Sequence, residues 1–140
     1  MMMMMLNCRS AQSQWVDKPR DTSQRLGLNV TFNCSAGAGH GDVAWTKLHG
    51  DTSTLLFVNE DSWNPDATRR MRSVAMPGGG FSLTLMSLER SDDARYQCTI
   101  RGDLSLSHTA TLTVLGMSTS ILLSLMYVLL SVCVCVCLLV

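Results

Sequence analysis

The feature that most constrains the fold is a short alternating stretch around a cysteine. In residues 95–101, Tyr96, Cys98 and Ile100 share one parity, and every residue between them is polar or charged. On a β-strand this alternation sends the first set into a core and the second to solvent. The stretch therefore predicts a half-buried strand whose inward cysteine needs a partner.

Only one other cysteine lies in the region that alternates like a folded domain. Cys34 precedes Cys98 by 64 residues (98 − 34), and the remaining cysteines are Cys8, Cys133, Cys135 and Cys137. Two lone cysteines at that spacing do not supply the close ligand pairs of a zinc site. They suit a single disulfide formed in an oxidising compartment. We expect no metal site and no cofactor.

Further alternating runs predict an all-β domain. Leu28, Val30 and Phe32 share the parity of Cys34, and Trp45 shares that of Val43. Pro19 lacks an amide donor, so it belongs on an edge or at a strand switch. Short strands separated by polar turns, with no helical periodicity, favour an antiparallel two-sheet sandwich over a βαβ fold. About eight strands are expected, at residues 15–24, 28–34, 43–48, 55–58, 70–76, 81–86, 95–101 and 109–115.

Four residues before and within the 95–101 strand carry a resemblance to a known superfamily. Asp92, Ala94, Tyr96 and Cys98 form the pattern Asp-x-Ala-x-Tyr-x-Cys, which resembles the immunoglobulin superfamily. The resemblance implies an immunoglobulin-like antiparallel two-sheet sandwich over residues 15–115. It also implies that the tyrosine hydroxyl bonds backbone just upstream, as in a tyrosine corner.

The same resemblance assigns partners to the cysteine pair and to the aspartate. Trp45, 11 residues after Cys34, is expected to pack on the disulfide between Cys34 and Cys98. In variable-type domains an arginine at the start of the fourth strand pairs with this aspartate. Arg70 is the first candidate for pairing with Asp92, and Arg72 is the second.

A narrower resemblance covers residues 14–115. The phrases 14–15, 19–22, 45–47, 81–83, 92–98 and 110–115 are similar to the first immunoglobulin domain of the nephrin and irregular chiasm adhesion family. That family recognises partner ectodomains through the sheet that contains the third, sixth and seventh strands. Carried over, the partner-binding face presents Thr46, Leu48, Gln97, Thr99, Thr109 and Thr111.

Two sequons predict N-glycosylation. Asn29-Val30-Thr31 and Asn33-Cys34-Ser35 both fit the acceptor pattern. Both asparagines are expected to point outward, and Asn29 is the better acceptor because Asn33 adjoins the disulfide cysteine. Glycan on this sheet would leave the opposite sheet for binding.

The two ends of the chain predict targeting segments. Residues 1–14 are interpreted as a degenerate signal peptide, since Met1–Leu6 is apolar but short, or as a wrongly assigned start. Residues 116–140 are interpreted as a hydrophobic membrane segment. The uncharged stretch 121–140 would span about 30 Å as a helix, the thickness of a bilayer core.

Three interpretations of this tail remain open. The first is a single-pass anchor with the domain outside the cell. The second is a glycolipid-anchor signal, for which the polar spacer is missing. The third is read-through of a dinucleotide repeat, because Val-Cys recurs at residues 132–137. No sequence feature requires palmitoylation of the three tail cysteines. For the location of the protein, the alternatives to a single-pass anchor are a glycolipid anchor and secretion.

The chain is not expected to be an enzyme or to bind nucleic acid. Eleven basic and eleven acidic residues cancel, so no field draws a polyanion. The three histidines lie in separate segments, and Gly78–Gly80 lacks the Lys and Ser/Thr of a phosphate loop. We expect a cell-surface recognition or adhesion protein that binds another ectodomain, homophilically or heterophilically. The alternative is an immune-type receptor fragment that binds a soluble or microbial ligand through loops 37–41 and 102–107.

Overall fold

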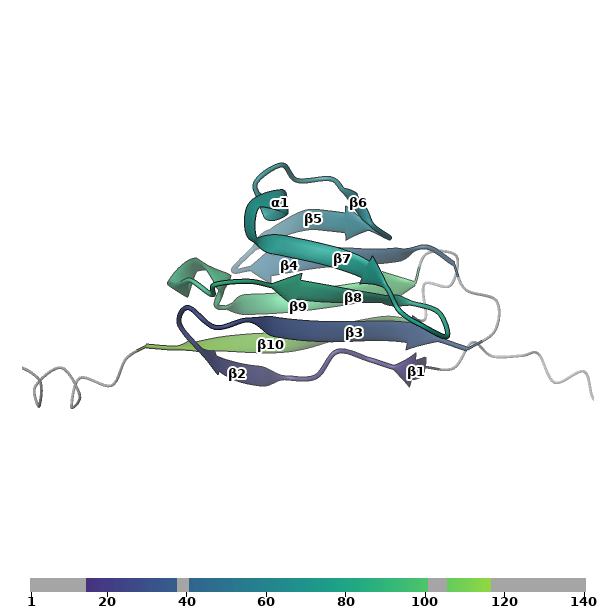
Figure 1. Cartoon of the computed structure of the whole chain (residues 1–140), viewed down its shortest axis with the longest axis horizontal. Helices are drawn as coiled ribbons and strands as arrows, with labels where there is room; N and C mark the ends of the chain where they lie inside the picture. The colour runs from purple at the N-terminus through teal and green to yellow at the C-terminus, as the bar shows by residue number, and fades with distance from the viewer. Residues whose placement is uncertain (1–14, 38–40, 101–105, 117–140) are drawn as a thin grey trace, which may run out of the picture.

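Two β-sheets packed face to face make up the described part of the chain. The computed structural model describes residues 15–37, 41–100 and 106–116. One sheet has four strands in the order β1-β3-β8-β7, and the other has six in the order β2-β10-β9-β4-β5-β6 (Figure 1). The expected immunoglobulin-like two-sheet sandwich is confirmed.

Ten strands are described, two more than the sequence predicts. The difference arises because residues 15–24 divide into two strands and because the 59–68 connection contains a short strand and the start of a helix. The elements are β1 Trp15–Asp17, β2 Thr22–Arg25, β3 Val30–Ala36, β4 Val43–His49, β5 Thr52–Val58, β6 Asp61–Ser62, α1 Ala67–Arg70, β7 Met71–Ala75, β8 Phe81–Leu85, the 3-10 turn η1 Arg90–Asp92, β9 Ala94–Ile100 and β10 Ser107–Leu115.

Inward-facing side chains of both sheets form one core, as the alternation predicts. Along β10, Ala110, Leu112 and Val114 are buried, while Thr111 and Thr113 are exposed. Each buried aliphatic or aromatic side chain contributes about 1.5–3 kcal/mol relative to exposure. The largest buried side chains are Trp45, Tyr96, Phe32, Leu83, Leu85 and Leu88.

Pro19 marks the point where the chain changes sheets. Before it, β1 pairs antiparallel with β3 of the four-stranded sheet. After it, β2 pairs parallel with β10 of the six-stranded sheet. A proline has no amide hydrogen to donate to a ladder, and Pro19 is buried between the two segments. The expectation of an edge or strand switch at this residue is confirmed.

Two local expectations are wrong, and one register irregularity was not foreseen. Leu28 is half exposed because the chain turns at Gly27, which has φ +79°, and β3 begins only at Val30. Arg70 ends the helix α1 and does not begin a strand. In β5 an extra residue, Leu56, interrupts the register with β4, and both Leu56 and its neighbour Phe57 are buried.

Among residues 15–37, 41–100 and 106–116, no helix is long and apolar enough to cross a membrane. The leader at 1–14 and, apart from Gly116, the hydrophobic segment at 116–140 lie outside the described residues. Their interpretations therefore stay predictions.

Candidate binding face

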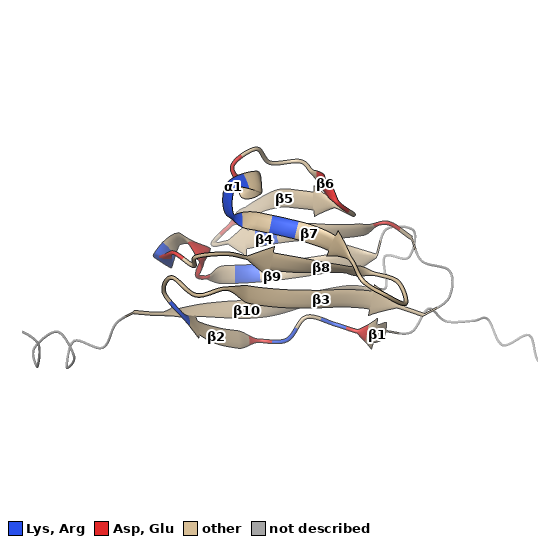
Figure 2. Ribbon diagram, in the orientation of Figure 1, with Lys and Arg blue, Asp and Glu red and all other residues tan. Residues whose placement is uncertain are grey.

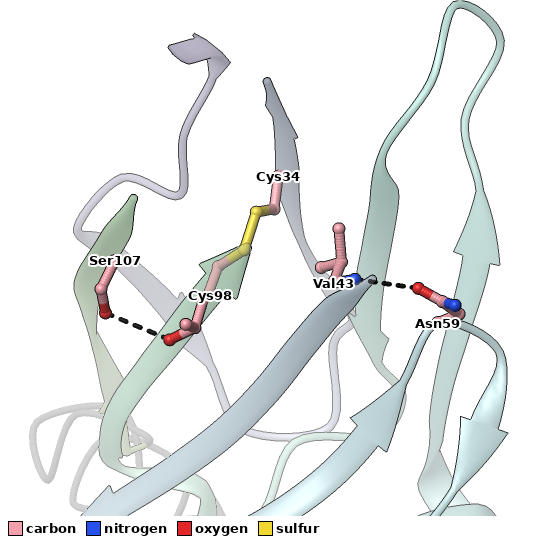
Figure 3. The surroundings of a disulfide bond; sticks show 6 residues. Cys34, Val43, Asn59, Cys98 and Ser107 are labelled. Atoms are coloured by element: carbon pink, nitrogen blue, oxygen red, sulfur yellow. Dashed lines mark hydrogen bonds between the residues drawn. A yellow bond between two sulfur atoms is a disulfide. The ribbon is translucent and has the colours of Figure 1, made fainter. Parts of the chain in front are cut away.

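The Cys34–Cys98 disulfide links the two sheets at the centre of the sandwich. Cys34 lies on β3 and Cys98 on β9, and both are fully buried (Figure 3). Trp45 on β4 lies directly opposite Cys98 in the ladder and is also fully buried. The structure thus confirms the disulfide and places Trp45 beside it.

The strand ends near this disulfide are held by polar side chains. The Asn59 side-chain oxygen accepts a hydrogen bond from the Val43 amide at 2.9 Å, and the hydroxyls of Thr99 and Ser107 are 3.1 Å apart (Figure 3). Both contacts fix the ends of β4, β9 and β10 where the loops leave the sheet.

Tyr96 fixes the turn that leads into β9. Its hydroxyl donates to the backbone oxygen of Asp92 at 3.0 Å, which is the geometry expected of a tyrosine corner. Its ring stacks on Phe32 across the sandwich, with centroids 5.6 Å apart. Burial and the nearby Asp92 carboxylate raise the pKa of the hydroxyl, so Tyr96 remains a neutral hydrogen-bond donor.

Arg70, and not Arg72, pairs with Asp92. Two guanidinium nitrogens of Arg70 contact the two carboxylate oxygens of Asp92 at 2.7 and 3.2 Å. Arg72 instead donates to the backbone oxygen of Thr68. The Asp92 carboxylate also accepts the Glu89 amide at 2.8 Å. The Asp92 side chain is therefore buried, and both of its oxygens accept hydrogen bonds.

Lys47 is a second cation beside the buried carboxylate. Its Nζ donates to the Ser91 oxygen at 2.6 Å and lies 4.0 Å from Asp92. Burial lowers the pKa of Lys47, and Asp92 partly opposes that shift. Burial alone would raise the pKa of Asp92, but the Arg70 and Glu89 hydrogen bonds and both cations hold it below its usual value. Asp92 thus stays ionised.

The outer face of the six-stranded sheet collects all six residues predicted to bind a partner. Cross-strand pairing between β6, β5, β4, β9 and β10 arranges outward side chains in three rows, and Thr113 and Leu115 continue the face toward Ser23 and Arg25 of β2. The upper row is Asp61, Val58, Ala44, Thr99 and Ser107; the middle row is Leu55, Thr46, Gln97 and Thr109; and the lower row is Ser53, Leu48, Arg95 and Thr111.

This face, which we call the GFC face after its central strands β10, β9 and β4, carries little charge. Asp61 and Arg95 are its only charged members among the described rows, and they lie in different rows. Figure 2 shows the strands mostly tan, with charged residues gathered in the connections, in α1 and in the β1–β2 segment. A nearly uncharged surface can be covered by a partner without a large desolvation cost.

Sequence reasoning missed the apolar edge of the GFC face. Leu55 is 37% exposed and pairs with Thr46. Trp63 is 64% exposed, and its amide bonds the Leu56 oxygen at 2.9 Å, which extends the β6 ladder. Trp63 therefore lies at the edge of the sheet, next to β5 and directly after β6. An exposed tryptophan in a connection is a signal that the sequence offers, because tryptophan is enriched in interface hot spots.

Both sequons lie on the four-stranded sheet. Asn33 is exposed on β3, and its side-chain nitrogen donates to Asp17 at 3.2 Å. Asn29 is exposed just before β3, and its side-chain oxygen accepts the Ser87 amide at 2.9 Å. The side-chain nitrogen of Asn33, the atom that would carry a glycan, is therefore hydrogen-bonded to Asp17. In Asn29 it is the side-chain oxygen that takes part in the hydrogen bond. Glycosylation of either residue stays a prediction.

The described residues were compared with the requirements of a metal site and of a pocket. None of them forms a group of three or more metal-ligating side chains. Two open clefts among the described residues, of about 390 and 410 Å³, lie at the β1–β2 connection and between α1 and β4. The second is lined by Lys47, Arg70 and Asp92, which already bond one another. Loop residues 38–40 and 101–105, which the alternative hypothesis requires, lie outside the described residues.

These features together define an immunoglobulin-type domain: two sheets, a central disulfide, a buried tryptophan and a tyrosine corner. The Immunoglobulin V-set domain model matches residues 17–115. The chain therefore belongs to the immunoglobulin V-set domain family.

Solved structures support this assignment. The chain is similar to Rst D1-D2 at 26% identity with a TM-score of 0.61, which covers 74% of this chain and 49% of that one. It is similar to Duf (Kirre) D1 at 26% identity with a TM-score of 0.60, which covers 76% and 99%. A chain from the structure of Dpr1 IG1 bound to DIP-eta IG1 shares 19% identity with a TM-score of 0.63, which covers 76% of this chain and 99% of that one. The chain spans about half of the Rst chain.

Proposed function

We propose that this protein is a cell-surface recognition protein that binds the ectodomain of another protein through its GFC face and performs no chemistry. One observation carries the proposal. The three rows of the GFC face contain only two charged side chains, Asp61 and Arg95, and the exposed Leu55 and Trp63 lie at one edge of the sheet. Such a surface is suited to a protein partner.

The position of the sequons supports this choice of face. Asn33 lies on β3 of the four-stranded sheet and Asn29 directly precedes that strand, so glycan at these positions would cover that sheet. The GFC face contains no sequon of its own. The Duf (Kirre) and Rst structures, each 26% identical, are consistent with an ectodomain context. Dpr1 IG1 is itself solved bound to another IG1 domain.

The proposed location is the cell membrane, with the domain outside. The buried Cys34–Cys98 disulfide requires an oxidising compartment, and residues 121–140 are uncharged and apolar. A single-pass anchor satisfies both. A glycolipid anchor or secretion are the alternatives, and release of the surface chain by a phosphatidylinositol-specific phospholipase would identify the glycolipid form.

A charge scan of both sheets tests the proposed face. Gln97 lies at the centre of the GFC face, so Gln97→Arg should lower binding of a panel of ectodomains at least tenfold. Val74, half exposed on β7 of the other sheet, provides the matched control, and Val74→Arg should leave binding unchanged. Binding is measured with the displayed full chain at equal surface levels.

The same scan separates the alternative function. If substitutions in loops 37–41 and 102–107 abolish binding while Gln97→Arg does not, the chain is a loop-based receptor. Loss of binding in Val74→Arg alone would contradict the proposed face.

A further inference from the structure

The end of the sandwich where β10 finishes carries exposed cations and exposed apolar side chains together. This end consists of the β2–β3 turn, η1 and the last residues of β10 (Figure 1). Leu28 in the turn is 50% exposed, and Leu115 at the end of β10 is 46% exposed. Arg25, which pairs with Leu115 in the ladder, and Arg90 in η1 are also exposed. We call these four residues the exit-end cluster.

Backbone contacts hold the exit-end cluster around the residue that follows β10. The Leu28 amide donates to the Arg25 oxygen at 3.2 Å, and the Leu88 amide donates to the Leu28 oxygen at 2.9 Å, which ties the turn to the segment before η1. The Arg90 guanidinium lies against Gly116, because a Cβ added at that glycine would collide with it. The cluster is therefore a fixed surface beside the point where the chain leaves the domain.

The acidic side chains at this end are engaged, whereas the two arginines of the cluster are not. Glu89 pairs with Arg70 at 3.3 Å, and the Asp93 carboxylate accepts a backbone amide of β10 at 2.9 Å. Within the described residues, neither Arg25 nor Arg90 makes an ion pair or a side-chain hydrogen bond. Figure 2 shows blue segments at the end of β2 and in η1. Guanidinium groups in this state suit a phosphate ligand, which they bind with two parallel hydrogen bonds.

The sequence that follows β10 indicates what covers this end. Only four residues, 117–120, separate Gly116 from the uncharged stretch 121–140. Four fully extended residues span at most about 14 Å. The headgroups occupy about 5–7 Å on each side of the hydrocarbon core of a bilayer. A helix that enters the bilayer at residue 121, as in the proposed single-pass anchor, therefore keeps the exit-end cluster within reach of the lipid headgroups.

We propose that the exit-end cluster docks on the phospholipid surface in which the chain is anchored. Arg25 and Arg90 bind lipid phosphates, and Leu28 and Leu115 enter the boundary between headgroups and acyl chains, where apolar side chains leave water. The anchor holds the cluster at a high effective concentration over the lipid, so contacts that are weak one by one suffice. This inference rests on the proposed membrane location and concerns a surface other than the three rows of the GFC face.

Docking at this end fixes the orientation of the domain on the membrane. The contacts come from the β2–β3 turn, η1 and β10, so the domain does not pivot freely about the four-residue linker. The strands of both sheets run away from the exit end (Figure 1). The three rows of the GFC face therefore stand upright on the membrane and stay uncovered for a partner.

Paramagnetic broadening of amide signals tests the docking. The full chain is placed in phosphatidylcholine nanodiscs that contain a lipid with a spin-labelled headgroup. The amide signals of Leu28 and Leu88 should broaden, whereas that of Val43, at the opposite end of the sheet, should not. Arg25→Glu with Arg90→Glu should reduce the broadening at Leu28 and Leu88 by about threefold or more, because both phosphate contacts are lost.

A matched variant and a separate binding assay keep the outcomes distinct. Lys18→Glu with Arg20→Glu makes the same charge change at exposed positions of the β1–β2 connection and should leave the broadening unchanged; an equal loss in this variant would overturn the docking. An inserted wild-type chain whose Leu28 signal broadens no more than that of Val43 also overturns it and leaves the anchor standing. A chain that does not enter the discs contradicts both. Ectodomain binding, measured on the displayed chain, decides the proposed function independently.

Discussion

The guanidinium of Arg70, at the end of α1, and the carboxylate of Asp92, at the end of η1, form an ion pair with two hydrogen bonds of 2.7 and 3.2 Å. The Asp92 side chain is 1% exposed and the Arg70 side chain 28%. The same aspartate supplies its backbone oxygen to the Tyr96 hydroxyl. One residue therefore joins the end of α1, the η1 turn and the start of β9.

Removal of Arg70 should destabilise the domain strongly. Arg70→Met leaves the buried Asp92 carboxylate with the Glu89 amide and, as its nearest cation, the more distant Lys47, and breaking a buried pair costs about 3–5 kcal/mol. Arg72→Met is the matched control, because Arg72 is exposed and bonds only the Thr68 oxygen; it should cost less than about 1 kcal/mol. Urea unfolding at pH 7 measures both. Equal losses in the two variants would contradict the role of the ion pair.

The ion pair should also make stability depend on pH. The pKa of Asp92 in the folded state is held below its ordinary value of 3.8. Its carboxylate therefore contributes stability that is fully present above the unfolded pKa and is lost as the pH falls through the folded pKa. The difference in unfolding free energy between wild type and Arg70→Met should shrink between pH 7 and pH 3. A constant difference over that range would show that Asp92 does not titrate as described.

Loss of the disulfide should cost more than any surface change. Cys34→Ala with Cys98→Ala opens a loop of 64 residues, which corresponds to roughly 4 kcal/mol in the chain-entropy model. Thermal unfolding of the oxidised wild type and of the double variant measures the loss. Reduction of the wild type should lower the melting temperature by a similar amount, and an unchanged melting temperature would remove the disulfide from the account of stability.

The turn between β7 and β8 should tolerate a methyl group at one glycine and not at another. Gly78 and Gly80 have nearly the same φ, +88° and +86°, so backbone strain from alanine is similar. A Cβ at Gly78 would meet open space, whereas one at Gly80 would meet the backbone of Cys34 and Ser35. Gly80→Ala should therefore lose more unfolding free energy than Gly78→Ala. Denaturant melts compare the two, and equal losses would contradict the close approach.

Glycosylation should favour Asn29 over Asn33. Expression in a secreting cell line followed by glycosidase treatment measures the mass of attached glycan. Asn29→Gln should remove most of the glycan, and Asn33→Gln should change it little, because Asn33 adjoins the disulfide and its side-chain nitrogen bonds Asp17. The reverse pattern would show that the hydrogen bond to Asp17 does not protect Asn33.

Much of this architecture follows from residue alternation, because burial repeats every second residue along a strand. The parity of Tyr96 and Cys98 predicts the core side of β9, and the parity of Ala110 to Val114 does the same for β10. The features that were missed depend on neighbours across the sheet. The extra residue at Leu56 exists only relative to β4, and the exposure of Leu28 follows from the turn at Gly27.

The candidate face was predictable in part for the same reason. Outward residues of β4, β9 and β10 follow from alternation together with the family resemblance. Trp63, Leu55 and Asp61 join the face only because β5 and β6 extend the sheet past β4. The sequence alone indicates a polar connection there, since the two-residue strand β6 is too short to show alternation.

A glycan placed on the GFC face tests the central claim most directly. Thr109→Asn creates the sequon Asn-Ala-Thr in the middle row, and Ser82→Asn creates Asn-Leu-Thr on β8 of the opposite sheet. Thr109→Asn with Thr111→Ala keeps the asparagine without the glycan. With occupancy verified by mass, Thr109→Asn should abolish ectodomain binding, while Ser82→Asn and the double variant should retain it. Binding that survives a glycan at position 109 but is lost with one at position 82 would contradict recognition through this face.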